Sequence, residues 1–320
     1  MILMEQKIKV GIIGCGSIAG AHAGGWKACG AEIVAVFDTN TERAKSFAEQ
    51  FGGEVKSDLT ALLDCGVDAV SITTPPVAHA DCAVEALKRN INVLMEKPFA
   101  LNLSDAQRVM EALKTSEGKL MTAFRHRYLP VNQKIKSMID SGELGEIVYF
   151  FNRFYGSNPA FASDWHSNPA VSGGGAAMDV ATHSVDLFRF FFGKIIDRKM
   201  QCACHFKGAV EDTAMIQLQS ASGVMGQITV GWTAGVGSDI VEVTGTKATA
   251  LYDYKVIDEL KIYRQGAAEP EVLKFPRTWA FPEQIRAFHD AIKNDTAVPV
   301  TAEDGLTNLQ DIFELYATQA

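Results

Sequence analysis

The chain has 320 residues, of which 30 are basic and 38 are acidic, so its formal net charge is −8. Hydrophobic residues make up 47% and charged residues 21%, a composition that excludes disordered and fibrous classes. The acidic balance argues against a nucleic-acid partner, and no apolar run reaches the ~18 residues of a membrane helix.

The N-terminus and the cysteines indicate a cytoplasmic protein. Glu5, Lys7 and Lys9 interrupt the first ten residues, so we expect no signal peptide. The six cysteines include no CxxC pair. Cys202 and Cys204 share one face of a predicted strand, but a second ligand pair is missing, so we expect buried reduced thiols and no metal site.

Short apolar runs alternate with helical patterns over the first third of the chain. The predicted strands are Lys7–Ile13, Glu32–Phe37, Val67–Thr73, Asn92–Glu96 and Lys119–Phe124, and the predicted helices are Ile18–Cys29, Thr41–Phe51, Val77–Arg89 and Ser104–Ser116. Thr41 and Ser104 are the predicted helix N-caps. This alternation predicts a parallel sheet with right-handed crossovers.

After about Phe124 the pattern becomes strand-rich. One predicted helix and one strand are followed by six strands and two closing helices, in the order Val131–Ser141, Ile147–Tyr155, Met200–Phe206, Ala214–Ser220, Val224–Trp232, Asp239–Thr244, Thr249–Tyr254, Leu260–Arg264, Glu283–Asn294 and Ala302–Ala317. Gly223 and Gly245 mark turns, so we expect an open, mainly antiparallel sheet that meanders. The predicted domains are 1–124 and 125–320, and the closing helix at about 302–317 is the element that could return to the first domain.

A glycine loop joins the first predicted strand to the first predicted helix and matches the spacing G-x-G-x-x-[GA]. The first glycine permits a tight turn, the second lets backbone approach a pyrophosphate, and the helix N-terminus offers N–H groups to that anion. A doubly wound Rossmann sheet is therefore expected, with Gly14, Gly16, Ser17, Ile18 and Ala19 as predicted cofactor contacts.

Asp38 ends the second predicted strand, about 24 residues after Gly14. A carboxylate there accepts hydrogen bonds from ribose hydroxyls and repels a 2′-phosphate, which favours NAD over NADP. Arg43 is close enough in sequence to reach a phosphate, so NADP stays possible. The alternative is a structural turn beside a solvated aspartate.

Two further segments follow predicted strands at the sheet edge where ligands bind in open α/β proteins. Thr73, Thr74 and Pro75 are expected along the ribose and nicotinamide. A second set of predicted cofactor contacts comprises His79, Glu96 and Lys97. His79 is equally well explained as a packing or capping histidine. Pro98 would restrict the backbone and aim the Lys97 ammonium at the nicotinamide end of the site.

The segment from Gly173 to Asp186 predicts a helix that begins after three glycines. Asp179 and His183 are four residues apart and share one helical face. A carboxylate one turn before an imidazole fixes its tautomer and raises its basicity, as a general base requires. The alternatives are an ordinary polar pair, or a metal site that also uses Asp186.

These motifs, in this order, resemble the Gfo/Idh/MocA oxidoreductase family over nearly the whole chain. The motifs are the glycine loop, Glu96-Lys97-Pro98, Arg127-Tyr128-Leu129-Pro130 and the G-G-G-x-x-x-D-x-x-x-H pattern ending at His183. The resemblance implies Lys97, Asp179 and His183 as the catalytic set, which also contacts substrate. It makes Arg127 and Trp165 further substrate-contact candidates, whereas His126 and His166 could line the pocket or lie on the surface.

The resemblance also implies hydride transfer between a nicotinamide cofactor and a secondary alcohol or ketone of a sugar, inositol or related polyol. Family members often form dimers or tetramers through the open sheet of the second domain, so a homodimer or homotetramer is expected. Two alternatives within the family are a redox-neutral NAD-dependent glycosidase and a non-catalytic regulator that senses the dinucleotide. Either His183 or Lys97 could be the proton acceptor, since the two groups can titrate as a coupled pair.

Overall fold

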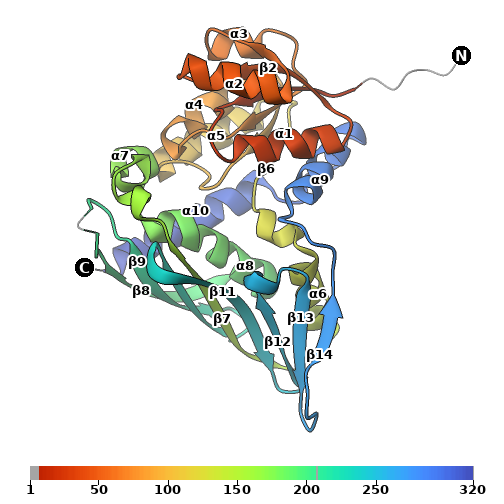
Figure 1. Ribbon diagram of the computed structural model, residues 1–320, viewed down its shortest axis with the longest axis vertical. Helices are drawn as coiled ribbons and strands as arrows, with labels where there is room; N and C mark the ends of the chain where they lie inside the picture. Colours follow the sequence, from red (N-terminus) through yellow and green to blue (C-terminus); the bar gives the residue numbers. More distant parts are fainter. Residues whose placement is uncertain (1–6, 207, 320) are drawn as a thin grey trace, which may run out of the picture. The chain divides into compact units, whose positions relative to one another are not determined.

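The computed structural model describes residues 7–206 and 208–319, in two compact units (Figure 1). The first unit contains Met1–Phe124 and Phe281–Leu306, and the second contains Arg125–Ala280 and Thr307–Ala320. Residues 1–6, 207 and 320 lie outside the described residues. Glu5, one of the three charged residues from which we expect no signal peptide, is among them.

The first unit is built on a six-stranded parallel sheet with the order β3-β2-β1-β4-β5-β6. Its strands are β1 (Lys9–Ile13), β2 (Glu32–Phe37), β3 (Glu54–Val55), β4 (Ala69–Ile72), β5 (Asn92–Met95) and β6 (Leu120–Thr122). This order is that of a doubly wound Rossmann sheet and confirms the predicted fold class. The sequence pattern misses β3, whose two residues are too few to show a periodicity.

The helices of the first unit follow the prediction within a few residues, except the short helix α3, which the sequence pattern misses. They are α1 (Ala19–Ala28), α2 (Thr41–Phe51), α3 (Leu59–Leu63), α4 (His79–Leu87), α5 (Leu103–Lys114) and α9 (Phe281–Lys293), with a 3-10 turn η1 at Pro76–Ala78. The predicted N-caps Thr41 and Ser104 are wrong. Asn40 and Asn102 cap α2 and α5 instead, because their side chains accept hydrogen bonds from Arg43 N and Asp105 N.

Helix α9 comes from the far end of the chain yet lies beside α1 (Figure 1). Trp26 of α1 meets Phe288 edge-on with ring centroids 6.0 Å apart, and both side chains are fully buried. A Cβ on Gly25 would come within 2.4 Å of Ile285 Cδ1, so the two helices approach at a glycine. The segment Phe281–Leu306 therefore joins the first unit, whereas the sequence boundary at 124/125 assigns it to the second. An amphipathic pattern does not reveal which sheet a helix covers.

The second unit is built on an eight-stranded sheet with the order β14-β13-β12-β11-β7-β10-β9-β8. Its strands are β7 (Ile147–Ser157), β8 (Ile195–Ala203), β9 (Thr213–Ser220), β10 (Met225–Gly231), β11 (Thr233–Gly245), β12 (Ala248–Asp253), β13 (Glu259–Arg264) and β14 (Glu271–Lys274). All pairs are antiparallel except β10 and β7. The sheet is thus mainly antiparallel as predicted, but β7 inserts between β10 and β11, so it is not a simple meander.

One face of this sheet is covered by the helical segment that follows the glycine run. The helical elements of the unit are α6 (Pro130–Asp140), α7 (Pro169–Ser172), the π-helical segment η5 (Ala177–Ala181), α8 (Thr182–Phe192) and the 3-10 turns η2 (Arg125–Tyr128), η3 (Pro159–Ala162), η4 (Trp165–Ser167) and η6 (Tyr254–Val256). Phe188 of α8 packs edge-on against Phe150 of β7 at 5.6 Å, and both rings are fully buried. A Cβ on Gly226 of β10 would come within 2.6 Å of Phe188, so α8 lies directly on the sheet.

Helix α10 (Ala302–Ala317) contributes its first residues, as far as Leu306, to the first unit and the rest to the second. Within the described chain, no helix combines the length and apolarity needed to cross a membrane. All six cysteines are free thiols. Only Cys15 and Cys82 are buried, and burial raises the pKa of each to about 12. The expectation that Cys202 and Cys204 are buried is wrong, because Cys202 is half-buried and Cys204 is exposed.

The contact between α1 and α9 predicts a large stability effect. Phe288→Ala should lower the free energy of unfolding by about 3–5 kcal/mol, because it leaves a cavity beside Trp26. Leu103→Ala, at an exposed position of α5 in the same unit, is the matched control and should change it by less than about 1 kcal/mol. Urea unfolding monitored by tryptophan fluorescence measures both variants, and equal shifts would contradict the packing described.

Candidate active site

The glycine loop between β1 and α1 is pressed against the chain that leaves β4. Gly14 has a φ of +88°, and a Cβ there would lie 2.9 Å from Thr73 C and Thr74 N. Thr73 holds the loop from the other side, since its hydroxyl donates to Gly14 O at 2.6 Å. Glycine is therefore required at this turn by its backbone conformation and by the close approach of β4.

Asp38 lies at the end of β2 and contacts the glycine loop directly. Its Oδ2 accepts a hydrogen bond from Cys15 N at 2.8 Å, and its Oδ1 accepts one from Asn40 N at 2.7 Å. The side chain is only 6% exposed, and Arg43 Nη1 lies 3.5 Å from its Oδ2. The structure thus brings Asp38 and the glycine loop together, with Arg43 beside them.

Two features of this loop fit a bound dinucleotide. Among the described residues, and apart from the neighbours of Gly16 in the chain, no atom lies within 4 Å of its Cβ position, so the space in front of its backbone is open. The hydroxyl of Thr74 is buried, yet within the described part of the chain it has no hydrogen-bond partner. An open approach to backbone at the start of a helix and an orphaned hydroxyl beside it are what a phosphate- and ribose-bearing ligand would fill.

His79 is fully buried and joins the two loops that carry the predicted cofactor contacts. Its Nδ1 lies 2.9 Å from Pro98 O, and its Nε2 lies 2.9 Å from Thr74 O. Burial lowers the pKa of this histidine, and the two carbonyl groups oppose that effect. In this structure His79 positions the backbone of both loops, as a packing histidine does.

Lys97 lies two residues after the end of β5 and is half-buried, and its peptide bond to Pro98 is cis. Glu96 is 8% exposed and faces inward, where its Oε1 lies 2.9 Å from His22 Nε2. His22 Nδ1 lies 3.1 Å from the Ser71 hydroxyl, and Trp26 Nε1 donates a hydrogen bond to that hydroxyl. Glu96 therefore anchors the turn that presents Lys97.

Asp179 and His183 lie in the second unit, on consecutive helical segments. Asp179 belongs to η5 and His183 to the first turn of α8, and both are half-buried. The sequence predicts one continuous α-helix here, whereas the structure widens the turn that carries Asp179 into a π-helix. Single π-helical turns within α-helices are frequent at functional sites.

His126 lies next to His183, with the two ring centroids 4.5 Å apart. It is buried, and its Nδ1 is 2.7 Å from the hydroxyl of Tyr254. Burial raises the pKa of that tyrosine well above its usual value. The structure thus brings His126 to the candidate catalytic imidazole, a neighbour that the sequence leaves undecided.

Arg127 forms a buried, two-pronged ion pair with Asp186. Its Nε donates to Asp186 Oδ2 at 2.9 Å and its Nη2 donates to Oδ1 at 2.6 Å, with side-chain exposures of 11% and 1%. Asp186 therefore pairs with an arginine, and the described residues contain no cluster of three metal-ligating side chains. Arg127, which the sequence predicts as a substrate contact, is therefore held in place by the Asp186 carboxylate.

Trp165 stands in η4 at the surface of the second unit, 39% exposed. Its ring stacks on His166 at a centroid distance of 3.7 Å, and His166 in turn stacks on Phe161 at 3.7 Å. His166 Nδ1 lies 2.8 Å from Asp164 Oδ1. The segment therefore presents a stacked aromatic group, of which Trp165 is the exposed end.

Family comparisons agree with these two units. Residues 8–124 match a family described as an oxidoreductase family with an NAD-binding Rossmann fold, and residues 132–251 match the Gfo/Idh/MocA C-terminal domain. The chain belongs to the Gfo/Idh/MocA oxidoreductase family. The resemblance read from the motifs is thereby confirmed, and with it a nicotinamide dinucleotide, NAD(H), as the cofactor.

Individual relatives cover different shares of the chain. It is 34% identical to "Oxidoreductase P35" from Formosa agariphila over 60% of this chain, and the match spans 63% of that protein. It is 32% identical to an "Inositol 2-dehydrogenase" from Rubrobacter xylanophilus over 77% of this chain and 71% of that protein. Among solved structures, a levoglucosan dehydrogenase in complex with NADH shares the fold, with a TM-score of 0.91, 22% identity and coverage of 98% of this chain and 97% of that one.

Several residues near the candidate site carry no sequence signal. The side chain of His22 contacts Glu96, and the hydroxyl of Tyr254 contacts His126. In each pair the two residues lie far apart in the sequence. A single sequence does not show such contacts, because only the fold brings the partners together. The R-[FY]-x-P motif does mark Arg127, but its partner Asp186 becomes visible only in the structure.

The geometry of Asp38 predicts a change in cofactor preference. Asp38→Ser should raise the Kd for NADH by about 10-fold or more, because hydrogen bonds to a charged acceptor are lost. The Kd for NADPH should rise less or fall, since the repelling charge is gone and Arg43 remains. Fluorescence titration with both dinucleotides measures this, with the exposed Glu42→Gln as the control. An unchanged ratio of the two Kd values would contradict the assignment.

The pair of Arg127 and Asp186 predicts a stability effect that a pure substrate contact would not have. Arg127→Ala should lower the free energy of unfolding by about 3–5 kcal/mol, because it removes the guanidinium that pairs with a buried carboxylate. The double variant Arg127→Met with Asp186→Leu should recover much of that loss. Urea unfolding measures both, and wild-type stability in Arg127→Ala would show that the guanidinium is not structural.

Proposed function

We propose that this chain transfers a hydride between NAD and a secondary alcohol or ketone of a sugar, inositol or related polyol. The observation that carries the proposal is the match of both units to the oxidoreductase family, in a chain that retains the lysine, aspartate and histidine motifs. The substrate class follows the relatives, which include an inositol 2-dehydrogenase, a scyllo-inositol 2-dehydrogenase and a levoglucosan dehydrogenase.

Each proposed role rests on the chemistry of one side chain. NAD supplies the nicotinamide ring that exchanges the hydride with the substrate carbon. His183 takes the proton of the substrate hydroxyl, and Asp179 orients the imidazole for that transfer. Lys97 donates a hydrogen bond to the oxygen on which negative charge develops. The side-chain amine of Lys97, in its neutral form, remains the other candidate for the proton acceptor.

The cofactor contacts are proposed for the loops described above. The backbone N–H groups at Gly16, Ser17 and Ile18 would face the pyrophosphate at the start of α1, with Ala19 keeping the helix close to the sheet. Asp38 would bind the adenosine ribose, and the Thr73–Pro75 segment would lie along the ribose and nicotinamide. Trp165 is proposed as a substrate contact, because it offers an exposed aromatic face.

The assigned roles predict a loss of turnover without a loss of cofactor binding. Lys97→Ala and His183→Ala should each lower kcat by about 100-fold or more, because general acid–base catalysis and stabilisation of the developing charge contribute on that scale. The Kd for NADH should stay within about threefold of wild type. Stopped-flow kinetics at saturating cofactor and fluorescence titration measure the two quantities. Full activity in either variant would overturn that residue's role.

A substrate panel separates this proposal from the two alternatives. Inositols, anhydrosugars and simple hexoses are offered with NAD and, in parallel, with NADP, and absorbance of the reduced dinucleotide is followed. Release of an aryl group from an aryl glycoside without net reduction of NAD would indicate the glycosidase. Tight NAD binding without any turnover on the panel would indicate the regulator.

We further propose a cytoplasmic homodimer or homotetramer that associates through the outer face of the eight-stranded sheet. Six free thiols fit a reducing compartment. Met215, Met225, Tyr263 and Val272 are each 43% or more exposed on strands of this sheet, and apolar groups of this kind favour association. Sedimentation equilibrium measures the assembly.

A further inference from the structure

The helical segment that carries Asp179 and His183 begins without a capping side chain of its own. It follows Gly173, Gly174 and Gly175, and its first flanking residue, Ala176, has no side chain able to accept a hydrogen bond. The first N–H groups of a helix have no partner within the helix, so another part of the chain must satisfy them or leave them unpaired.

One distant residue, Glu211, accepts hydrogen bonds from three consecutive N–H groups at this helix start. Its carboxylate Oε1 accepts from Gly175 N at 3.1 Å and from Ala177 N at 3.0 Å. Its backbone carbonyl accepts from Ala176 N at 2.8 Å. Glu211 therefore caps a helix that begins more than thirty residues before it, and its carboxylate stands at the N-terminal, positive end of that helix.

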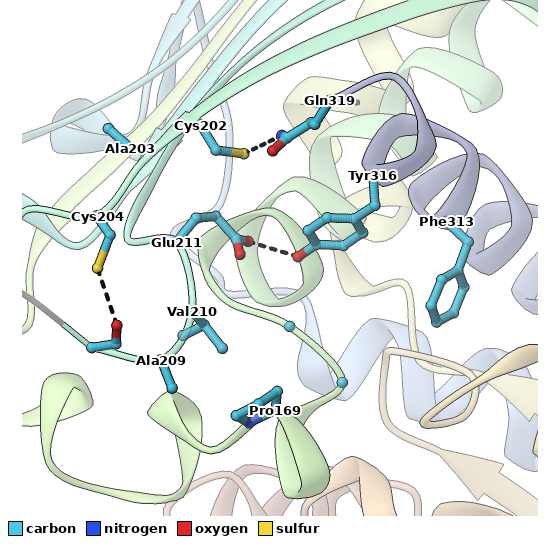
Figure 2. A pocket seen from close by; sticks show the side chains of 13 residues that line it. Pro169, Cys202, Ala203, Cys204, Ala209, Val210, Glu211, Phe313, Tyr316 and Gln319 are labelled. Carbon is cyan, nitrogen blue, oxygen red and sulfur yellow. Dashed lines mark hydrogen bonds between the residues drawn. The ribbon is translucent and has the colours of Figure 1, made fainter.

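Tyr316 of α10 fixes the capping carboxylate from the other side. Its hydroxyl donates to the same Oε1 of Glu211 at 2.6 Å, and Figure 2 shows the two side chains pointing toward each other. Burial raises the pKa of the Glu211 carboxyl, and burial together with this carboxylate raises the pKa of Tyr316 well above its usual value, so Tyr316 remains a donor. The pair lines a cavity of about 550 Å³ between β8, the segment before β9, and α10.

Gly174 and Gly175 have no Cβ, and this leaves room for Tyr316 and Glu211. A Cβ on Gly174 would lie 2.3 Å from Tyr316 Oη, and a Cβ on Gly175 would lie 1.8 Å from Glu211 O. Both glycines are buried. The sequence suggests a mobile or exposed start to the helix, whereas the structure shows a packed one that only glycine can form.

The cap sets where the next turn begins, because Asp179 N donates to Gly175 O at 2.9 Å. A shift of the Gly175–Ala177 segment therefore moves Asp179 directly, and His183 one turn later moves with it. We propose that Glu211 and Tyr316 are positioning residues that hold the Asp179–His183 segment in its working place. This inference rests on the proposed roles of Asp179 and His183.

Paired variants of Glu211 test the acceptor rather than the bulk of the side chain. Glu211→Ala removes the carboxylate acceptor and should lower kcat about 10- to 100-fold, because a displacement of about 1 Å costs that much. Glu211→Gln keeps an oxygen in the same place and should stay within about threefold of wild type. Tyr316→Phe should lower kcat about two- to tenfold, as expected for one lost hydrogen bond. Glu269→Ala, at an exposed position, is the matched control.

Two further readouts separate positioning from a general loss of structure. Hydrogen exchange on the NADH-bound protein should quicken in peptides spanning 174–183 for Glu211→Ala and not for Glu211→Gln, while the Kd for NADH stays unchanged. In a His183→Ala background, Glu211→Ala should cause no further loss of kcat, since both act through one imidazole.

Each outcome decides the proposal. Wild-type kcat and exchange in Glu211→Ala, an equal loss in Glu211→Gln, or fully additive losses with His183→Ala would overturn it. If Glu211→Ala does not fold, Tyr316→Phe decides, and wild-type kcat and exchange in that variant would overturn the proposal. If His183→Ala itself retains full activity, the proposed role of His183 fails, whereas the exchange experiment still tests the cap alone.

Discussion

A buried chain of hydrogen bonds connects the first helix of the Rossmann unit to the turn that presents Lys97. Trp26 and His22 on α1 both contact the Ser71 hydroxyl on β4, and His22 continues to Glu96 at the end of β5. Each of these side chains is at least nine-tenths buried, so an unpaired member would be costly. The helix that follows the glycine loop and the turn after β5 that carries Lys97 are thereby fixed relative to each other.

His79 supplies the same kind of constraint between the loops after β4 and β5. It touches the carbonyl groups of Thr74 and Pro98, and so it relates the candidate cofactor loop to the turn after Lys97. His79 and Glu96 can affect the candidate site without touching a ligand, because they hold the loops after β4 and β5 in place. Their effect is to fix the backbone that carries the proposed ligand contacts.

The sequence predicts the fold well where the signal is local and poorly where it depends on distant partners. The five longer parallel strands and α2 appear with bounds within a few residues, because apolar runs and glycine turns are short-range features. The insertion of β7 between β10 and β11 and the return of α9 to α1 are missed, because no local pattern encodes which strand or helix is the neighbour. The predicted N-caps fail for a smaller reason. Asn40 directly precedes Thr41, and Asn102 lies two residues before Ser104, so each helix start offers two residues whose side chains can cap.

At the candidate site, too, the sequence predicts local features and misses contacts between distant residues. The motifs identify Lys97, Asp179 and His183 by residue type and spacing, but they are silent about His126 beside His183 and about the carboxylate of Asp186 that fixes Arg127. The π-helical turn at Asp179 is likewise invisible in the sequence, where the four-residue spacing is compatible with either helix type.

The two units use one device for placing a helix that follows glycines. In the first, Gly14 is pressed on the chain after β4, and Asp38 from another strand accepts the N–H of Cys15. In the second, Gly175 is pressed on Glu211, whose carboxylate accepts N–H groups from the same turn. In both, a remote carboxylate accepts backbone N–H groups near the start of a helix, where the helix dipole favours negative charge. At Gly175 the missing Cβ makes room for Glu211 itself, whereas at Gly14 it makes room for the backbone of Thr73 and Thr74. The two carboxylates differ in their surroundings. Asp38 lies beside the loop proposed to bind the dinucleotide, whereas the carboxylate of Glu211 accepts a further hydrogen bond from Tyr316.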